Sequence, residues 1–217
     1  LDDVVAAFNH GAPAYADVLD QLEADEVTVV PFMTSAGYFS DVVLPRELAK
    51  NKRYTRLALN MTAPIGTHPV IADIVAQRVN ALQRTYDLDQ ARTSLAVVGH
   101  GTERYERSRS ASITLARRMR EFGVAREAVV AFLDEEPHVE TILQLAHYPC
   151  VIVVPFLIGA GLHAATDIPA RIGIHARGVP QPPVRAQVAS RIVICDAAIG
   201  TLPAILQAVD AVVRESR

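Results

Sequence analysis

Residues 27–37 read VTVVPFMTSAG and residues 150–161 read CVIVVPFLIGAG, and these two stretches are versions of one pattern. When residues 3–45 are written beneath residues 127–169, at a constant shift of 124 positions, the VVPF cores coincide and a glycine and two prolines match around them. A pattern that persists over so many positions indicates an internal duplication, which decides the fold before any single element is assigned.

The duplication continues downstream of these stretches. PIGTHP at residues 64–69 resembles AIGTLP at residues 198–203, now at a shift of 134 positions. The ten additional residues of the second copy fit a proline-rich loop at residues 177–190. We therefore expect two halves, residues 1–90 and residues 91–217.

Each half alternates β-branched runs with segments of helical periodicity, which predicts an α/β fold. The runs of the second half are apolar throughout, as in parallel strands that are covered on both faces. We expect strands at 95–101, 128–134, 150–156 and 191–197, and helices at 110–123, 137–148 and 201–216. The predicted fold is two similar, Rossmann-like halves, each built on a parallel sheet.

The first half lacks one predicted element. Its residue 1 aligns with residue 125, so residues 91–124 have no counterpart in the first copy. The missing segment holds a strand that usually lies at the centre of such a sheet. Either the natural chain begins earlier or another segment supplies this strand, and we expect the sequence to be part of a larger protein.

The composition excludes several classes of protein. Of the 217 residues, 50% are hydrophobic and 21% are charged, and the formal net charge is −3. This balance is unlike that of a disordered chain or a basic nucleic-acid-binding protein, and no apolar run reaches the ~18 residues of a membrane span. Cys150 and Cys195 lie far apart in apolar runs, so we expect buried free thiols in a reducing cytoplasm.

Polar residues follow three predicted strands of the second half, where parallel α/β folds bind ligands. His100 lies between two glycines in VVGHGT, His163 follows a glycine-bracketed loop, and Asp134, Glu135 and Glu136 stand together after another strand. Two imidazoles and a carboxylate at one cleft can bind a divalent metal ion or transfer protons. The structural alternatives are a hydrogen-bonded histidine at a strand end and acidic residues that compensate a helix dipole.

Comparison of the two copies favours chemistry in the second half. The positions of Pro155, Gly161 and Pro169 keep their residue types in the first copy, which is typical of structural positions. His163, in contrast, aligns with Phe39, and the acidic run has no acidic counterpart.

Other catalytic schemes fit the sequence poorly. There is no G-x-S-x-G elbow, no phosphate-binding P-loop and no G-x-G-x-x-G fingerprint. A strand followed by HGT is also found in histidine phosphatases, but those enzymes need an arginine directly before the histidine, and Gly99 occupies that position here.

The motifs of the second half resemble those of class II tetrapyrrole chelatases, the CbiX-like family of sirohydrochlorin cobaltochelatases and ferrochelatases. They are VVGHGT (97–102), AFLDEEP (131–137), VVPFLIGAGLHAATDIP (153–169) and IGTLP (199–203). The first half resembles the same family through VVPFMTSAG and PIGTHP. This resemblance implies a chelatase-like fold of two halves with the active site in the cleft between them.

The resemblance also implies the reaction. Members insert cobalt, iron or nickel into sirohydrochlorin or a related tetrapyrrole, so the divalent metal ion is a substrate and no organic cofactor is expected. His100 and His163 match the two active-site histidines, as metal ligands and bases, because neutral imidazole binds these ions and titrates near neutrality. The acidic residue of the family matches Asp134 or Glu135, since the motif is displaced by one position.

A macrocycle with several carboxylates needs cationic partners, and the loop after His100 offers Arg104 and Arg107, with Arg109 following. Gly101 and Gly161 are expected to line the substrate site. The same arginines can also be merely solvated at a helix start.

Two other functions remain compatible with the sequence. The chain can be a metal or tetrapyrrole carrier without catalysis, or a degenerate chelatase-fold domain with a structural role in a larger protein. Ring nitrogens of His100 and His163 within about 4–7 Å of each other across an open cleft would favour the enzyme, because metal–nitrogen bonds measure ~2.0–2.1 Å.

Overall fold

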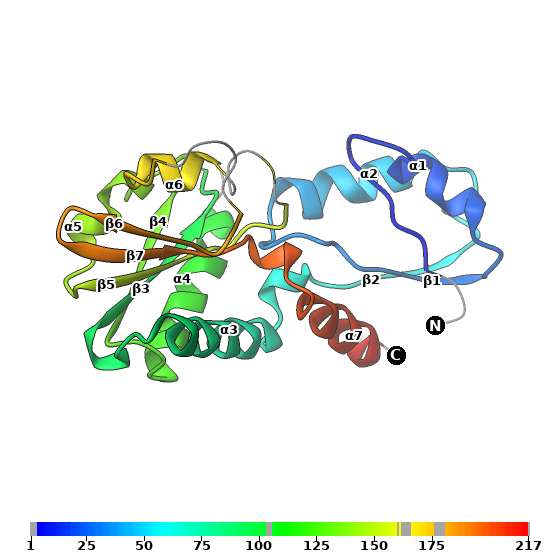
Figure 1. The fold of residues 1–217 in the computed structure, drawn as a ribbon. Helices are drawn as coiled ribbons and strands as arrows, with labels where there is room; N and C mark the ends of the chain where they lie inside the picture. The colour runs from blue at the N-terminus through cyan, green and yellow to red at the C-terminus, as the bar shows by residue number, and fades with distance from the viewer. Residues whose placement is uncertain (1–3, 103–105, 160, 162–165, 176–180, 217) are drawn as a thin grey trace.

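The computed structural model describes residues 4–102, 106–159, 161, 166–175 and 181–216. It shows two lobes side by side, with the larger one built on the second repeat (Figure 1). In the part of the chain that is described, no helix is both long and apolar enough to cross a bilayer.

The larger lobe contains a five-stranded sheet in the order β4-β3-β5-β7-β6. Its strands are β3 (Thr93–Gly99), β4 (Glu127–Phe132), β5 (Cys150–Pro155), β6 (Val184–Val188) and β7 (Arg191–Cys195). The four strands predicted from apolar runs are β3, β4, β5 and β7, and they are parallel. The fifth strand, β6, is antiparallel and lies in the segment that was expected to be only a proline-rich loop, so the sheet is mixed.

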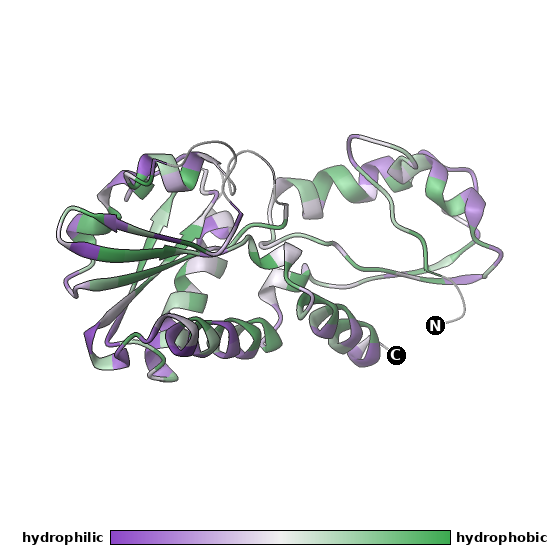
Figure 2. Ribbon diagram, in the orientation of Figure 1, coloured by the Kyte–Doolittle hydropathy of each residue, from purple (hydrophilic) through white to green (hydrophobic). Residues whose placement is uncertain are grey.

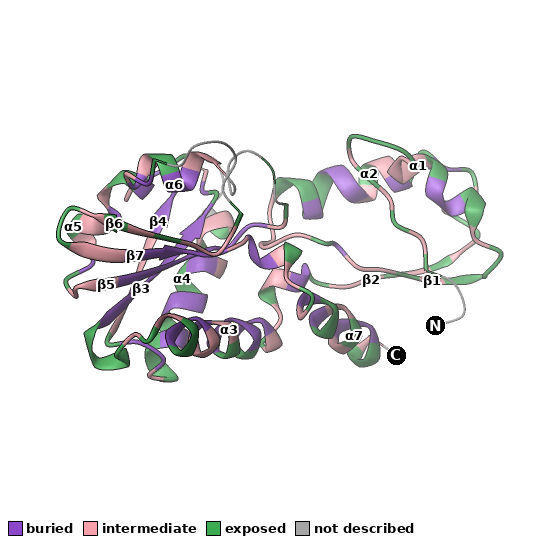
Figure 3. Ribbon diagram, in the orientation of Figure 1, coloured by how far each residue is buried: buried purple, intermediate pink, exposed green. Residues whose placement is uncertain are grey.

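Helices cover both faces of this sheet (Figure 1). On one face, α3 (Val70–Tyr86) and α4 (Glu106–Glu121) pack with apolar residues of the central strands, including Leu95, Ile152 and Phe156. On the other face, α5 (Ile142–Leu145) and α6 (Ile168–Arg171) pack on the alternate residues of the same strands. All seven residues of β3 are buried (Figure 3). The strands are therefore apolar on both sides, as their sequence predicted (Figure 2).

Two of the predicted helices differ from the observed ones. The helix expected at 137–148 was wrong: it is replaced by a 3₁₀ turn, η5 (Val139–Thr141), and the single helical turn α5. The carbonyl of Pro137 accepts a hydrogen bond from Phe132 N–H at 2.9 Å, which keeps the chain extended into residue 138. The helix expected at 201–216 is divided into η7 (Ile199–Thr201) and α7 (Ile205–Glu215).

The smaller lobe contains a two-stranded parallel sheet of β1 (Glu26–Val29) and β2 (Ala58–Met61). Its helical elements are α1 (Tyr15–Val18), η1 (Leu19–Gln21), the π-helix η2 (Phe39–Val43) and α2 (Leu44–Leu48). Val18, Leu19, Leu44 and Leu48 form its buried core. Within the described residues, no strand other than β2 pairs with β1, as expected from the missing counterpart of residues 91–124.

The register of strand pairing repeats the duplication. Glu26 lies opposite Ala58 in the smaller lobe, and Cys150 lies opposite Ile192 in the larger lobe. These positions differ by the shifts of 124 and 134 found in the sequence. The two copies therefore form the same β-pairing, which supports a fold of two similar halves.

A pair of glycines shows the same correspondence in packing detail. A Cβ at Gly66 would collide with the backbone of Thr34, and a Cβ at Gly200 would collide with the backbone of Ile158. Each glycine permits a close approach of two loops at an equivalent place in its lobe. The IGT motifs around them form the 3₁₀ turns η3 (Ile65–Thr67) and η7.

Helix α3 comes from the first repeat but packs on the sheet of the second, so the two lobes share helices. Arg78 on α3 binds Asp196, directly after β7, through two hydrogen bonds of 2.6 and 2.8 Å. In the opposite direction, Asn60 on β2 donates to the carbonyl of Ser216 at the end of α7. The division at residue 90 therefore separates the two repeats of the sequence, but it does not separate the two lobes of the structure.

Candidate active site

The ends of β3 and β4 bring two of the predicted residues together. The peptide N–H of Leu133 donates to the carbonyls of Gly99 and His100, both at 3.1 Å, and the N–H of Asp134 donates to the His100 carbonyl at 3.0 Å. These bonds continue the pairing of the strands beyond their last residues. As a result, the residues that follow the two strands leave the sheet at the same place.

His100 and Asp134 form an exposed pair at this edge. The distance from Nδ1 of His100 to Oδ2 of Asp134 is 3.1 Å, and the side chains are 58% and 59% exposed. A carboxylate at Nδ1 favours the tautomer with the proton on that nitrogen, so that the lone pair is on Nε2. This pair can bind a cation or accept a proton at a surface that substrates can reach.

The neighbouring carboxylate, Glu135, points the other way. Its side chain is 6% exposed, and Oε2 lies 3.7 Å from Nη1 of Arg109. Among the described residues, Oε1 has no hydrogen-bond partner. Arg109 also stacks on Phe132, 5.4 Å from the ring centroid. The structure thus separates two acids that the sequence left equivalent: Asp134 contacts the imidazole, whereas Glu135 is buried beside an arginine.

Gly101 provides the space for Glu135. Its φ is +77°, and a Cβ at this position would lie 2.7 Å from Cγ and 3.0 Å from Oε1 of Glu135. Gly161, in contrast, has no described atom within 4 Å of its Cβ position. Of the two glycines predicted to line the site, only Gly101 is held in close contact by its neighbours.

Arg107 connects the two lobes next to the site. Its Nη2 lies 3.2 Å from Oδ2 of Asp41 on η2, and the arginine side chain is 74% exposed. The Ser40 hydroxyl donates to Oδ1 of Asp41 at 2.7 Å and so orients the carboxylate. Predicted residues His163 and Arg104 lie outside the described residues.

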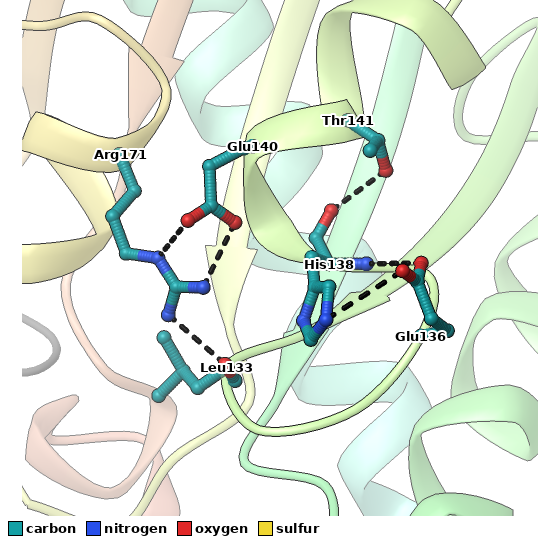
Figure 4. Close-up of polar contacts among 6 residues, drawn as sticks. All are labelled: Leu133, Glu136, His138, Glu140, Thr141 and Arg171. Carbon is teal, nitrogen blue, oxygen red and sulfur yellow. Dashed lines mark hydrogen bonds and ion pairs between the residues drawn. The ribbon is translucent and has the colours of Figure 1, made fainter.

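An arginine outside the sequence predictions supports the loop of residues 133–136, the acidic loop, through a backbone carbonyl. Arg171, the last residue of α6, donates from Nη1 to the carbonyl of Leu133 at 3.0 Å and forms two bonds with Glu140, of 2.6 and 2.8 Å (Figure 4). These hydrogen bonds lower the pKa of Glu140 below its usual value. On the far side of the same turn, Glu136 approaches His138, with 3.6 Å between Oε1 and Nε2. A comparison of the two repeats at residues 16 and 47 was the signal that could have revealed Arg171 and Glu140.

Among the described residues no metal cluster marks this site, and a hollow in the surface lies away from it. In the described ranges there is no group of three or more His, Cys, Asp or Glu side chains placed to hold a metal ion. A hollow of about 340 Å³ lies elsewhere, between β2, η3 and α7, and is lined in part by His68 and Glu215. His68 accepts a hydrogen bond from Val70 N–H at 3.2 Å, at the start of α3.

Comparison with known proteins identifies the family. The model of the CbiX family matches residues 1–82 and 94–216, which together make up most of the chain. The chain belongs to the CbiX family. The two matched segments follow the two repeats of the sequence.

Several relatives of this CbiX-family chain are known. A probable sirohydrochlorin cobaltochelatase of Halobacterium salinarum is 33% identical over 189 residues, which cover 78% of this chain and 64% of the relative. DR2241 of Deinococcus radiodurans, described as a multi-domain protein with structural similarity to chelatases, has a TM-score of 0.77 and 25% identity. The match includes 100% of this chain and 47% of DR2241. The chain thus spans between about half and two thirds of these two relatives.

Two further structures share the fold. CbiX, the terminal enzyme for siroheme biosynthesis in denitrifying bacteria, has a TM-score of 0.71 and 19% identity, with 92% of this chain and 79% of CbiX covered. SirB of Bacillus subtilis, solved with Fe³⁺, has a TM-score of 0.72 and 17% identity, with coverages of 95% and 78%. The CbiX-family chain therefore has the expected α/β fold of two halves.

Proposed function

We propose that this chain inserts a divalent metal ion into a sirohydrochlorin-type tetrapyrrole. The observation that carries the proposal is the exposed His100–Asp134 pair, 3.1 Å apart, at the carboxyl ends of adjacent parallel strands. Membership of the CbiX family and the cobaltochelatase relative supply the substrate class. Cobalt, iron and nickel all remain candidates, because imidazole nitrogen suits each of them.

The reaction requires proton acceptors as well as metal ligands. Two pyrrole N–H bonds break, metal–nitrogen bonds form in their place, and two protons leave the macrocycle. In this proposal Nε2 of His100 binds the ion first and then accepts a proton once the ion has moved to the macrocycle, while Asp134 stabilises the resulting imidazolium. A metal ion that must be released to the macrocycle needs to be held by few protein ligands. His100 is the first of these ligands, and we propose His163 as the second.

The remaining residues act on the macrocycle. Arg107, which is largely exposed beside Asp41, and Arg104 are proposed to bind its carboxylates through charge-assisted hydrogen bonds. Glu135 is buried, with one oxygen unpartnered in the described part of the chain, and we propose that it receives the second pyrrole proton. Gly101 leaves the space that this carboxylate occupies.

Metalation can be followed by absorption, with Co²⁺ and sirohydrochlorin as substrates. We expect His100→Ala and His163→Ala to abolish the spectral change and Asp134→Asn to slow it by about 10-fold or more, as for other partners of ligating histidines. His147→Ala is a matched control, because His147 forms a similar pair with Glu127, 3.0 Å apart, at the amino end of the strands. It should leave the rate unchanged.

Two outcomes would overturn the proposal in different ways. Full turnover in the His100 and His163 variants would remove these side chains from the mechanism. Saturable binding of the macrocycle without any acceleration of metalation would instead support a carrier that performs no catalysis.

A further inference from the structure

We propose that Arg171, anchored by Glu140, is a positioning residue for the His100–Asp134 pair. The inference rests on the proposed function, since it concerns the same site. Arg171 donates to the carbonyl of Leu133, on the inner side of the acidic loop (Figure 4). In the part of the chain that the structure describes, the hydrogen bonds of Arg171 go to Leu133 and Glu140, so its effect on the reaction is argued through the backbone.

One peptide group transmits the effect. The carbonyl of Leu133 and the N–H of Asp134 belong to the same planar unit. The carbonyl accepts from Arg171 at 3.0 Å, and the N–H donates to the carbonyl of His100 at 3.0 Å. Because both ends are bonded, the plane cannot rotate without breaking one of these bonds. The direction in which the Asp134 side chain leaves the backbone is thereby set toward the imidazole.

The guanidinium is itself held in place. Glu140 accepts two bonds from Arg171, at 2.6 and 2.8 Å, in a bidentate arrangement that fixes orientation as well as distance. Arg171 is 30% exposed, so water screens the pair only in part. A donor with a full positive charge polarises the peptide and strengthens the bond from Asp134 N–H to His100.

The first repeat shows that a helix at the position of α6 can pack in its lobe without the arginine. At a shift of 124 positions, Glu47 corresponds to Arg171 and Ala16 corresponds to Glu140. Helix α2 still packs in the core of the smaller lobe through Leu44 and Leu48. The Arg171–Glu140 pair is thus present only in the repeat that also contains the His–Asp pair, which favours a role in the site over a role in the fold.

The first measurement tests the backbone effect without any substrate. Amide hydrogen exchange of Asp134 is compared in the wild type, in Arg171→Met and in Arg214→Met, a control that removes an arginine paired with Asp210 on α7. We expect exchange at Asp134 to be about 10-fold faster in Arg171→Met, consistent with loss of a hydrogen bond to a charged group. Equal protection in all three proteins would overturn the proposal.

The second measurement is a double-mutant cycle on metalation kinetics, with Arg171→Met, Asp134→Asn and the double variant. Arg171→Met should lower kcat by about 10-fold with little change in KM for the macrocycle, and Arg171→Lys should restore part of the loss. In the Asp134→Asn background, the same replacement should change kcat by less than about 2-fold, because the two residues act through one contact.

The outcomes separate this inference from the proposed function. An inactive wild type refutes the proposed function, while amide exchange still decides whether Arg171 fixes the peptide. An active wild type with fully additive losses in the cycle refutes the positioning role alone.

Discussion

Replacement of Gly101 by alanine tests the packing that connects the backbone to the candidate site. Gly101 has a φ of +77°, and an added Cβ would lie 2.7 Å from Cγ of Glu135 and 2.9 Å from Cβ of Phe132. Both neighbours are buried, at 5% and 1% exposure, so neither can move into solvent. Gly123, after α4, has a similar φ of +63°, but no atom of the residues that the structure describes lies within 4 Å of its Cβ position.

The two glycines form a matched pair because they differ only in the overlap. The left-handed backbone costs an alanine about 1–2 kcal/mol at either position, and the entropic effect on the unfolded chain is the same. Overpacking adds about 1–3 kcal/mol at Gly101 alone. We therefore expect Gly101→Ala to reduce the free energy of unfolding by about 1–3 kcal/mol more than Gly123→Ala does, as measured by urea unfolding followed by circular dichroism.

The same pair makes a kinetic prediction. The methyl group at Gly101 must displace Glu135 or the backbone next to His100, and a displacement of about 1 Å can lower a rate about 100-fold. Gly123→Ala should metalate at the wild-type rate. Equal stability losses in the two variants, or unchanged metalation in Gly101→Ala, would refute the close packing of Gly101 against Glu135.

Three further predictions concern stability and reactivity. Asp196 is 1% exposed and accepts two hydrogen bonds from Arg78, which is 30% exposed, so Asp196→Ala should reduce the free energy of unfolding by about 1.5–3 kcal/mol; a loss below about 1 kcal/mol in urea unfolding would contradict this. Hydrogen bonds from Arg171 lower the pKa of Glu140. The contribution of this interaction to the free energy of unfolding is therefore fully present above pH about 4.3 and is lost as pH falls through the lowered pKa. Glu140→Gln should therefore flatten the acid side of the stability curve, and a curve that matches the wild type would argue against the pairing. Burial, with a smaller contribution from Asp196, raises the pKa of Cys195 to about 12, so iodoacetamide at pH about 8 should modify this thiol only after unfolding, as mass spectrometry would show.

The sequence predicted the strands of the larger lobe well and one helix poorly. The strands are continuous apolar runs, and burial on both faces requires such runs whatever surrounds them. Residues 137–148 also have a buried face, since Val139, Ile142 and Ala146 are fully covered. That spacing suits a 3₁₀ turn followed by one helical turn as well as it suits a helix, and the bond from Phe132 N–H to the Pro137 carbonyl decides between them. A long-range bond of this kind is invisible in local periodicity.

The site was predicted as far as chain direction allows. His100 and Asp134 follow parallel strands, so the strand assignments place both at the same edge of the sheet. The pairing of β3 with β4, which the structure shows, then brings the two side chains within 3.1 Å. The choice between Asp134 and Glu135 depends on the direction in which each side chain leaves the turn after β4. The sequence alone does not determine that direction for two consecutive residues. Arg171 and Glu140 are 31 positions apart and meet only because α6 and η5 cover the same face of the sheet.

The VVPF motif shows how one sequence pattern takes on two environments. Phe156 in the second copy is 1% exposed, whereas Phe32 at the equivalent position is 42% exposed. The N–H of Phe156 donates to the carbonyl of Val98 on β3 at 2.7 Å, and α3 and α4 complete the core around its ring. In the described part of the smaller lobe, no strand takes the place of β3 beside β1. The motif therefore specifies a strand and the loop after it, but the coverage of its phenylalanine comes from the neighbouring strand and helices. The larger lobe has that strand, β3, and His100 follows directly after it. The element that completes the core is therefore also the element that brings the imidazole to the site.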